Sequence, residues 1–214
     1  RKIPLGFDPK YFNINQIERK AVRSKLGLDG FVIGFFGRIT YEKGIHILID
    51  ALKMIKNYKW TLLIDEFDIY KSKFQENIHN QIVNSGLINR VVSINPKHDE
   101  MGSFINSVDV VVMPSISTSS WVEQYGRIAA ESMGCGKLVV ASISGALPML
   151  LNGRGILFEE GNVEGLSKIL EKLIINKQTY KYNEQEISEY AHLELSINKQ
   201  MKEMLSLFKE TGAL

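Results

Sequence analysis

Two glutamates, Glu123 and Glu131, stand eight positions apart on either side of Gly126. The residues after Gly126 predict a helix over 126–134, which puts Glu131 little more than one turn inside it and Glu123 just outside. Carboxylates accept hydrogen bonds from hydroxyl groups, and the free N–H groups at the start of a helix favour an anion. The pair therefore fits a site for a ribose, whose adjacent hydroxyls one carboxylate can hold. A plainer alternative is that the helix dipole alone favours Glu131.

A pair of cations precedes this stretch, in the sequence FFGRITYEKG of residues 35–44. Gly37 and Arg38 lie at the end of a predicted strand, and Lys43 opens the next predicted helix. Glycine lets the backbone approach a ligand, helix N–H groups point at it, and the cations neutralise it. These features suit a diphosphate, although an exposed Arg and Lys in an ordinary loop would look the same. The Walker pattern GxxxxGK[ST] and the dinucleotide pattern GxGxxG are both absent.

The rest of the chain predicts the scaffold that would position these residues. Short β-branched runs alternate with helical segments, which is typical of a parallel sheet with helices on both faces. Strands are expected at 31–36, 60–64, 91–94, 109–114, 137–142 and 155–158. Helices are expected at 44–55, near 70–85, 98–106, 126–134 and 163–175, and as one apolar stripe over 186–210. We therefore predict an α/β fold with a doubly wound, Rossmann-like, mostly parallel six-stranded sheet, which binds its ligand beyond the carboxyl ends of the strands.

The chain divides into three parts by composition and pattern. Residues 1–30 read as an interdomain linker with a first helix, residues 31–176 as the ligand-binding domain, and residues 177–214 as a helical tail. The chain opens with RKIPLGFDPKYF and no initiator Met, so we expect it to be part of a longer protein.

Composition excludes several classes of function. Of 214 residues, 44% are apolar and 23% are charged, as in an ordinary globular protein, and a net charge of +2 does not argue for nucleic acid. The single cysteine, Cys135, cannot form an internal disulfide, and it lacks the partner residues that catalysis or metal binding needs. A reducing, cytoplasmic location is therefore expected. No stretch approaches the ~20 apolar residues that span a membrane.

Taken together, the motifs resemble the C-terminal, donor-binding domain of GT-B glycosyltransferases, in particular the retaining enzymes of glycosyltransferase family 4 (group 1). The resemblance covers residues 3–175 and runs through IPLGFDPKYF, FFGRITYEKGIHILIDAL, VDVVVMPS and GRGILFEEGNVEGLSKIL. Its most specific part is the E-x7-E motif of EQYGRIAAESMGCGKLVVAS, formed by Glu123 and Glu131. It implies one half of a GT-B enzyme that moves a hexosyl group from a nucleoside diphosphate sugar to an acceptor hydroxyl.

The resemblance implies a role for each residue of these motifs. Arg38 and Lys43, with Gly37, would hold the donor diphosphate and stabilise the leaving nucleoside diphosphate as charge develops on it. Glu123 would contact hydroxyls of the transferred sugar and position its anomeric carbon, so that Glu123, Arg38 and Lys43 form the catalytic set. Glu131 would accept hydrogen bonds from the ribose.

Two backbone segments would complete the donor site. Amides at Tyr125, Gly126 and Arg127 would meet the distal phosphate and the sugar. The strand-end residues 94–96, which are Ile94, Asn95 and Pro96, would contact the base, and this base could be uracil, guanine or adenine. The resemblance implies no cofactor and no metal, and the D-x-D motif that would bind one is absent.

The implied partners follow from the same resemblance. These are a UDP-, GDP- or ADP-linked sugar and an N-terminal acceptor-binding domain of the same enzyme, toward which the tail helix would pack. By itself this chain is expected to bind donor weakly and to transfer little. Membrane association, at most peripheral to the inner face, would come from the other domain.

The chain departs from the family pattern at several positions. A glycine-rich turn often follows the second strand in the family, whereas this chain has LLIDEFDIYK, and we expect Asp65, Glu66 and Asp68 to be a solvated acidic loop. Met149 stands where a polar or acidic residue is common. Trp121 could flank the sugar, but an anchor for its loop is the safer interpretation. The histidines are scattered and are expected at the surface or in satisfied core positions; they are His46, His79, His98 and His192.

Three alternatives stay open from the sequence. Another GT-B chemistry, such as a sugar-nucleotide epimerase or a phosphorylase, would be expected to lack the E-x7-E motif. A glycosidase that used Glu123 and Glu131 as its two carboxylates would give Arg38 and Lys43 no role. A non-catalytic module that only senses nucleotide sugars could carry every motif found here.

Overall fold

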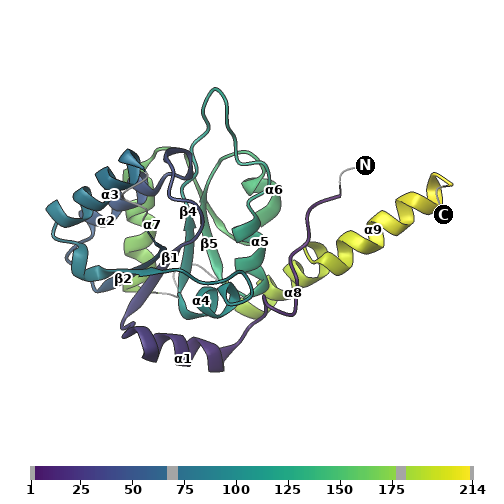
Figure 1. Cartoon of the computed structure of the whole chain (residues 1–214), viewed down its shortest axis with the longest axis horizontal. Helices are drawn as coiled ribbons and strands as arrows, with labels where there is room; N and C mark the ends of the chain where they lie inside the picture. Colours follow the sequence, from purple (N-terminus) through teal and green to yellow (C-terminus); the bar gives the residue numbers. More distant parts are fainter. Residues whose placement is uncertain (1–2, 67–71, 177–181, 213–214) are drawn as a thin grey trace.

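The computed structural model of the chain describes residues 3–66, 72–176 and 182–212. These form a six-stranded, all-parallel sheet in the order β3-β2-β1-β4-β5-β6 with helices on both faces (Figure 1). The strands are β1 (Phe31–Phe35), β2 (Trp60–Asp65), β3 (Val91–Ile94), β4 (Val110–Met113), β5 (Leu138–Ser142) and β6 (Ile156–Phe158). The predicted doubly wound, Rossmann-like sheet and each of its predicted strands are confirmed.

Helix α1 precedes the first strand, and the other helices connect successive strands or follow the last one. They are α1 (Gln16–Leu26), α2 (Ile45–Met54), α3 (Lys73–Asn84), α4 (Met101–Ser107), α5 (Arg127–Gly134), α6 (Leu147–Leu151), α7 (Val163–Ile175), α8 (Glu184–Glu194) and α9 (Ile197–Glu210). Two 3₁₀ turns, η1 (Tyr41–Lys43) and η2 (Ile88–Arg90), precede α2 and β3. Asn162 caps α7 as predicted, because its side chain accepts from the backbone N–H of Gly165 at 2.7 Å.

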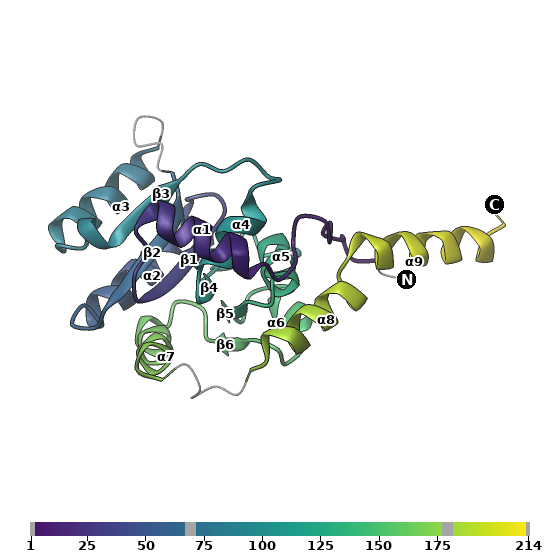
Figure 2. The same cartoon turned by 90° about the horizontal axis from the view of Figure 1, so that it is seen from below.

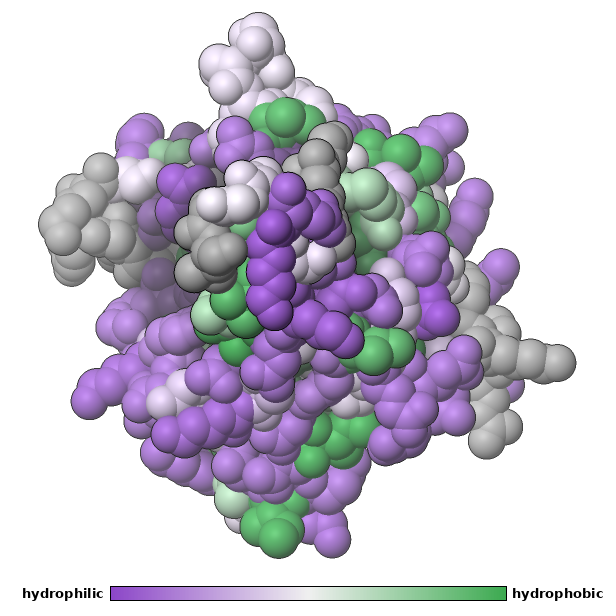
Figure 3. All heavy atoms as spheres, turned by 90° about the vertical axis from the view of Figure 1, so that its right-hand side faces the viewer, coloured by the Kyte–Doolittle hydropathy of each residue, from purple (hydrophilic) through white to green (hydrophobic). Residues whose placement is uncertain are grey.

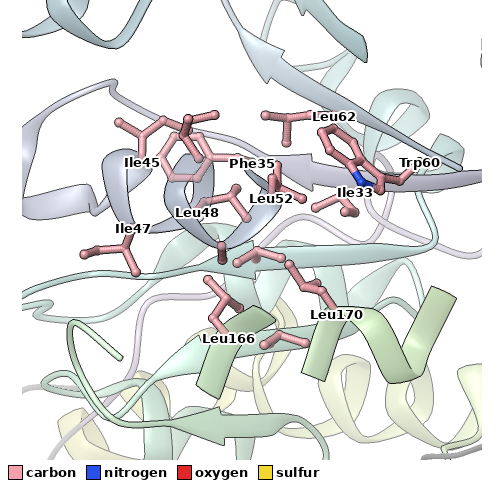
Figure 4. Packing of buried hydrophobic residues seen from close by; sticks show 14 of the residues in the cluster. Ile33, Phe35, Ile45, Ile47, Leu48, Leu52, Trp60, Leu62, Leu166 and Leu170 are labelled. Carbon is pink, nitrogen blue, oxygen red and sulfur yellow. The ribbon is translucent and has the colours of Figure 1, made fainter. Parts of the chain in front are cut away.

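Alternate residues of each central strand enter opposite cores, as the two-residue period of a strand requires. On one face, Ile33 and Phe35 of β1 pack with α2, α3 and α7, and Figure 4 shows Leu48 and Leu166 of those helices reaching the same cluster. On the other face, Val32 packs with residues of α4, α5, α6 and α8. The whole of β1 is therefore buried, which explains why its sequence is a continuous apolar run.

The strand order places the carboxyl ends of β1 and β4 side by side. The chain runs outward from β1 through β2 to β3, then returns across the sheet to β4 and continues outward to β6. The loops after β1 and β4 thus diverge to opposite faces and leave a crevice between them, which is where open α/β sheets bind ligands. The residues 35–44 and 114–126 lie in these two loops.

The tail differs from its prediction. A single helix over 186–210 is wrong, because α8 ends at Glu194 and α9 begins at Ile197. Between them the chain forms a bridge with Phe7, which donates its N–H to the carbonyl of Leu195 and accepts from the N–H of Ile197 at 2.8 Å. Ser196 then caps α9 by accepting from Lys199. Helix α9 consequently projects away from the sheet (Figures 1 and 2).

The N-terminal segment packs onto the sheet domain. Phe7 and Phe12 are buried in the second core, and α1 lies against α4. Arg19 of α1 pairs with Asp109 at 2.6 Å, and Asp109 also accepts from the N–H of Val32 at the start of β1. A buried carboxylate thus ties α1 to two strands, β1 and β4.

Candidate functional site

Two adjoining cavities open at the carboxyl ends of β1 and β4. One, of about 450 Å³, is lined by Lys43 and Glu123, and the other, of about 530 Å³, is lined by Glu131 and Pro96. The residues that line both cavities are Gly37, Arg38, Arg127 and Ile128. The junction therefore carries two arginine side chains and a glycine, and each cavity holds one of the two glutamates.

The first cavity is built around an ion pair between Lys43 and Glu123. The Nζ atom of Lys43 lies 2.7 Å from Oε2 of Glu123, and Ser115 donates its hydroxyl to the same oxygen at 3.0 Å. Glu123 is only 6% exposed, so an ammonium and a hydroxyl compensate a carboxylate that is almost out of water. Sequence reasoning missed Ser115, although this serine is the last residue of the motif VDVVVMPS and begins the loop after the predicted strand 109–114.

Close backbone contacts fix the position of Glu123. The N–H of Ala146 donates to the carbonyl of Glu123 at 2.9 Å, and Gly145 (φ 51°) lies so close that an added Cβ would meet that carbonyl oxygen at 2.0 Å. Gly44 (φ 71°) allows an equally close approach beside Lys43, where a Cβ would meet the carbonyl oxygen of Pro114 at 1.8 Å. Glycine is needed at both positions because of the backbone angle and because of the contact.

Glu131 has a different environment at the base of the second cavity. It lies in the second turn of α5, is 2% exposed, and has its nearest cation, the Nε of exposed Arg127, 3.6 Å from Oε1. Burial raises the pKa of Glu131 to about 7, against a smaller lowering by Arg127. Among the described residues no hydrogen bond reaches this carboxylate, so it can accept from a ligand's hydroxyl groups.

The start of α5 separates the two glutamates and presents backbone N–H groups. Gly126 (φ 79°) precedes the helix and offers no side chain to cap it, and the first intrahelical bond runs from Ala129 N–H to the Gly126 carbonyl at 2.8 Å. The amides before Ala129 therefore lie at an uncapped helix opening that lines the first cavity. Tyr125 lines the same cavity and donates its hydroxyl to the carbonyl of Leu5, from the N-terminal segment. Burial raises the pKa of Tyr125 to about 12, so it stays protonated.

The expectation of a solvated acidic loop after β2 is wrong for Asp65. Its carboxylate accepts from the N–H of Gly37 at 2.7 Å, while its other oxygen is buried without a hydrogen-bond partner among the described residues. Burial raises the pKa of Asp65 because little water reaches it. Glu66 is exposed and accepts from Asn95, as a surface residue would, and Asp68 lies outside the described residues. The β2 end is adjacent to the β1 end in the sheet, which the sequence does not reveal.

The strand-end segment after β3 reaches the second cavity in part. Pro96 lines it, whereas the side chain of Ile94 is buried in the core and its carbonyl accepts from the N–H of Glu66. His98, expected at the surface, is exposed and also lines this cavity. The remaining histidines lie elsewhere, as His46 stacks on Tyr41 and His192 contacts the carbonyl of Gly134.

The other singled-out residues have structural positions. Met149 is 73% exposed on α6 and lines neither cavity. Cys135 is a buried free thiol, and burial raises its pKa to about 12. In residues 3–66, 72–176 and 182–212, no group of three or more His, Cys, Asp or Glu side chains could hold a metal ion. Within the same ranges, none of the helices has the length and hydrophobicity to cross a membrane.

Comparison with known proteins agrees with this arrangement. A family model described as glycosyl transferases group 1 matches residues 16–192. An uncharacterized glycosyltransferase of Methanocaldococcus jannaschii is 33% identical over 150 residues, which cover 69% of this chain and 39% of that protein. The capsular polysaccharide biosynthesis glycosyltransferase CapM of Staphylococcus aureus is 29% identical, over 79% of this chain and 43% of CapM.

A solved structure shows the same likeness in three dimensions. HepE of Anabaena, in complex with UDP, superposes with a TM-score of 0.83 at 26% identity, over 96% of this chain and 56% of HepE. HepE has also been solved with UDP-glucose. The chain thus spans about two fifths of the curated relatives and about half of HepE. This chain belongs to the group 1 glycosyltransferases.

Proposed function

We propose that this chain binds a nucleoside diphosphate sugar across the two adjoining cavities and forms the donor-binding half of a retaining hexosyltransferase. The observation that carries the proposal is the division of the site. Glu123 lines one cavity, Glu131 lines the other together with Asp65 and Glu66, and Gly37 with Arg38 lies at their junction. The nucleoside would occupy the cavity of Glu131 and Pro96, the diphosphate would lie at Arg38, and the sugar would lie beside Glu123.

The chemistry proposed for the first cavity uses the residues that line it. In transfer, the bond between the anomeric carbon and the diphosphate oxygen breaks, a new bond forms to the acceptor oxygen with the anomeric configuration kept, and the proton of the acceptor hydroxyl passes to the departing diphosphate. The departing diphosphate gains negative charge, which the exposed Arg38 and Lys43, itself held by Glu123, can neutralise. Lys43 is held beside the site by Glu123, and Oε1 of Glu123, which accepts no hydrogen bond within the described residues, is proposed to accept from a sugar hydroxyl. No metal is needed in this proposal, because the two cations supply the positive charge.

The acceptor is proposed to bind a second domain. The chain spans about two fifths of CapM, and HepE has UDP and UDP-glucose complexes, so a donor-binding half joined to an acceptor-binding half is consistent with both. The exposed apolar residues of α9 would pack toward that second domain; they are Ile197, Met201, Leu205 and Phe208. A cytoplasmic enzyme, at most peripheral to the membrane through that other domain, is the proposed setting.

A ligand titration tests the donor site directly. UDP, GDP and ADP, and their glucose or mannose conjugates, are titrated into the chain while its thermal unfolding is measured. A ligand at 100 times its Kd adds about 2.7 kcal/mol to the free energy of unfolding. We expect one nucleotide to stabilise the chain, and we expect Arg38→Ala and Glu131→Ala to abolish the shift. Lys168→Ala and Glu164→Ala, which remove charges at exposed positions of α7, are the matched controls and should leave the shift intact.

The catalytic part of the proposal needs the chain joined to its acceptor domain. There, Glu123→Gln should lower kcat far more than donor affinity, because Glu123 is proposed to act on the reacting sugar. Equal loss of affinity and turnover would argue for a binding role alone. Addition of EDTA should leave the rate unchanged.

A further inference from the structure

The loop between β4 and α5, residues 114–126, projects beyond the rest of the sheet edge. It forms the extension at the top of Figure 1, and in Figure 3 the same projection is nearly neutral in hydropathy. Its residues from Ser117 to Ser120 are exposed, as is Val122, whereas Trp121 between them is half-buried. Because the indole is half-buried while its neighbours in the loop are exposed, it contacts another part of the molecule.

Trp121 faces the ion pair of the first cavity. The Nζ atom of Lys43 lies 5.1 Å from the centroid of the Trp121 ring, and the same atom lies 2.7 Å from Glu123. An aromatic ring, an ammonium and a carboxylate thus stand in sequence: Glu123 and Lys43 line the cavity, and the Trp121 ring lies beside Lys43, next to the lining residues. The distance permits a cation–π attraction, which holds the ring in place when no ligand is bound.

The loop that carries Trp121 is hydrogen-bonded to two other segments of the chain. The N–H of Ile116 donates to the carbonyl of Glu42 at 2.8 Å, in the turn that also carries Lys43. Ser117 donates its N–H and its hydroxyl to the two oxygens of Glu160, at 2.8 and 2.7 Å. The N–H of Thr118 donates to the carbonyl of Trp121 at 2.8 Å and closes the loop on itself. These bonds hold the backbone that carries Trp121, and Lys43 contacts its ring, so the indole is held before a ligand arrives. This lowers the entropic cost of a contact with it.

We infer that Trp121 packs its ring against the transferred sugar of the donor and raises affinity for the sugar conjugate over the nucleoside diphosphate alone. This inference rests on the proposed donor-binding function. A hexose has hydroxyls at its edge and C–H groups on its faces, so it needs hydrogen-bonding groups beside an apolar plane. Glu123 and Lys43 supply the first, and the indole, with its large apolar face, supplies the second. Lys43, which the ring contacts, lines the first cavity and does not line the second, where the nucleoside is proposed to bind.

Paired titrations test the inference on this chain. UDP and UDP-glucose, and in parallel GDP and GDP-mannose, are titrated by calorimetry into the unaltered chain and into Trp121→Ala and Trp121→Phe. We expect Trp121→Ala to weaken the sugar conjugate by about five- to tenfold, the effect of one lost aromatic contact, and to change the affinity of the nucleotide less than twofold. Trp121→Phe should keep much of the difference. Val122→Ala, the neighbouring exposed apolar residue, is the matched control and should change neither affinity.

Tryptophan fluorescence gives a second measurement that does not depend on affinity. The other tryptophan, Trp60, is 2% exposed in the core, so a ligand at the site reaches Trp121 alone. The sugar conjugate should change the emission more than the nucleotide does, and Trp121→Phe should remove that difference.

The outcomes separate this inference from the proposed function. Equal weakening of nucleotide and conjugate in Trp121→Ala would mean that the ring acts only through Lys43, and would overturn the inference. Unchanged affinity for both ligands would overturn it as well. In either case the proposed donor site would stand, because the nucleotide would still bind. Failure of the unaltered chain to bind any of these ligands would overturn the proposed function, and the inference with it.

Discussion

The two glutamates of the site belong to one motif but lie in opposite electrostatic surroundings. Glu123, in the loop before α5, has a lysine at 2.7 Å and a serine hydroxyl at 3.0 Å on the same carboxylate oxygen. Glu131, inside α5, is also buried, and its one charged partner among the described residues is an arginine at 3.6 Å, whose side chain is 69% exposed. The fold therefore compensates one carboxylate and leaves the other short of partners.

The difference has a structural cause. Glu123 lies in the loop between β4 and α5, and Lys43 lies in the turn η1 after β1; because β1 and β4 are neighbours in the sheet, the Lys43 side chain reaches Glu123. Glu131 points from a helix whose neighbours are mainly apolar residues of the second core, such as Ala130 and Met133. A group that is stable without ligand suits a fixed catalytic position, whereas a group left unsatisfied suits ligand binding, because a hydroxyl that reaches it removes a penalty.

The largest expected effect on stability comes from removing the cation beside Glu123, the compensated carboxylate. Lys43→Met leaves the buried carboxylate of Glu123 without its cation and should lower the free energy of unfolding by about 3 to 4 kcal/mol, near the low end for a buried pair because Lys43 is partly exposed. Urea denaturation measures the change. The double variant Lys43→Met/Glu123→Gln should recover most of the loss, and a loss below about 0.5 kcal/mol in the single variant would contradict the comparison.

Removing the charge of Glu131, the uncompensated carboxylate, should raise the free energy of unfolding and not lower it. The pKa of Glu131 is raised from 4.5 to about 7 by burial, so the folded chain binds a proton more tightly than the unfolded chain between these values. Its contribution to stability is present below about pH 4.5 and is lost as the pH rises toward 7. Glu131→Gln escapes this loss and should be more stable than the unaltered chain at pH 8 by up to roughly 3 kcal/mol.

At about pH 3.5, a unit below the unfolded-state pKa of 4.5, the same variant should nearly match the unaltered chain, because Glu131 is then mostly neutral in both states. Thermal unfolding at the two pH values measures the difference. A variant that is less stable at pH 8 would mean that Glu131 has a compensating partner after all. The gain in stability should come with loss of nucleotide binding.

A substitution that strains the backbone can disturb the cavity of Glu123 and spare the cavity of Glu131. Gly145→Ala forces a side chain onto the carbonyl oxygen of Glu123 and into a left-handed backbone angle, at a cost of about 2 kcal/mol. Gly153→Ala has a similar angle (φ 75°) but nothing within 4 Å, so it measures the cost of the angle alone. Calorimetry should show that Gly145→Ala weakens UDP-glucose more than UDP; equal weakening of both would mean that the disturbance reaches Glu131.

The smallest effect is expected at Arg127. Its guanidinium is 69% exposed, so Arg127→Ala should change the free energy of unfolding by less than about 0.5 kcal/mol. It should raise the pKa of Glu131 further, because Arg127 is the group that lowers it. An NMR titration of the Glu131 carboxyl measures this shift, and a fall in the pKa would contradict it.

Much of the fold could be predicted from local pattern. Continuous apolar runs predict the central strands because both faces of β1 and β4 are covered, and Asn162 predicts the start of α7 because an Asn side chain can cap a helix. The tail was less predictable. The helical spacing of its apolar residues runs past Leu195 and Ser196 without a break. The bridge to Phe7, from the other end of the chain, divides the tail into α8 and α9 at this point.

The sequence by itself determined the six strands and most of the helices, the residue types of the candidate site and the eight-residue spacing of the two glutamates, because these depend on neighbours along the chain. The tertiary structure decided which residues meet. Lys43 pairs with Glu123 across 80 positions, Asp65 takes the N–H of Gly37 across 28, and the indole of Trp121 lies over Lys43. All three contacts arise because β1 lies between β2 and β4, an order that depends on long-range packing of the helices and not on any local pattern.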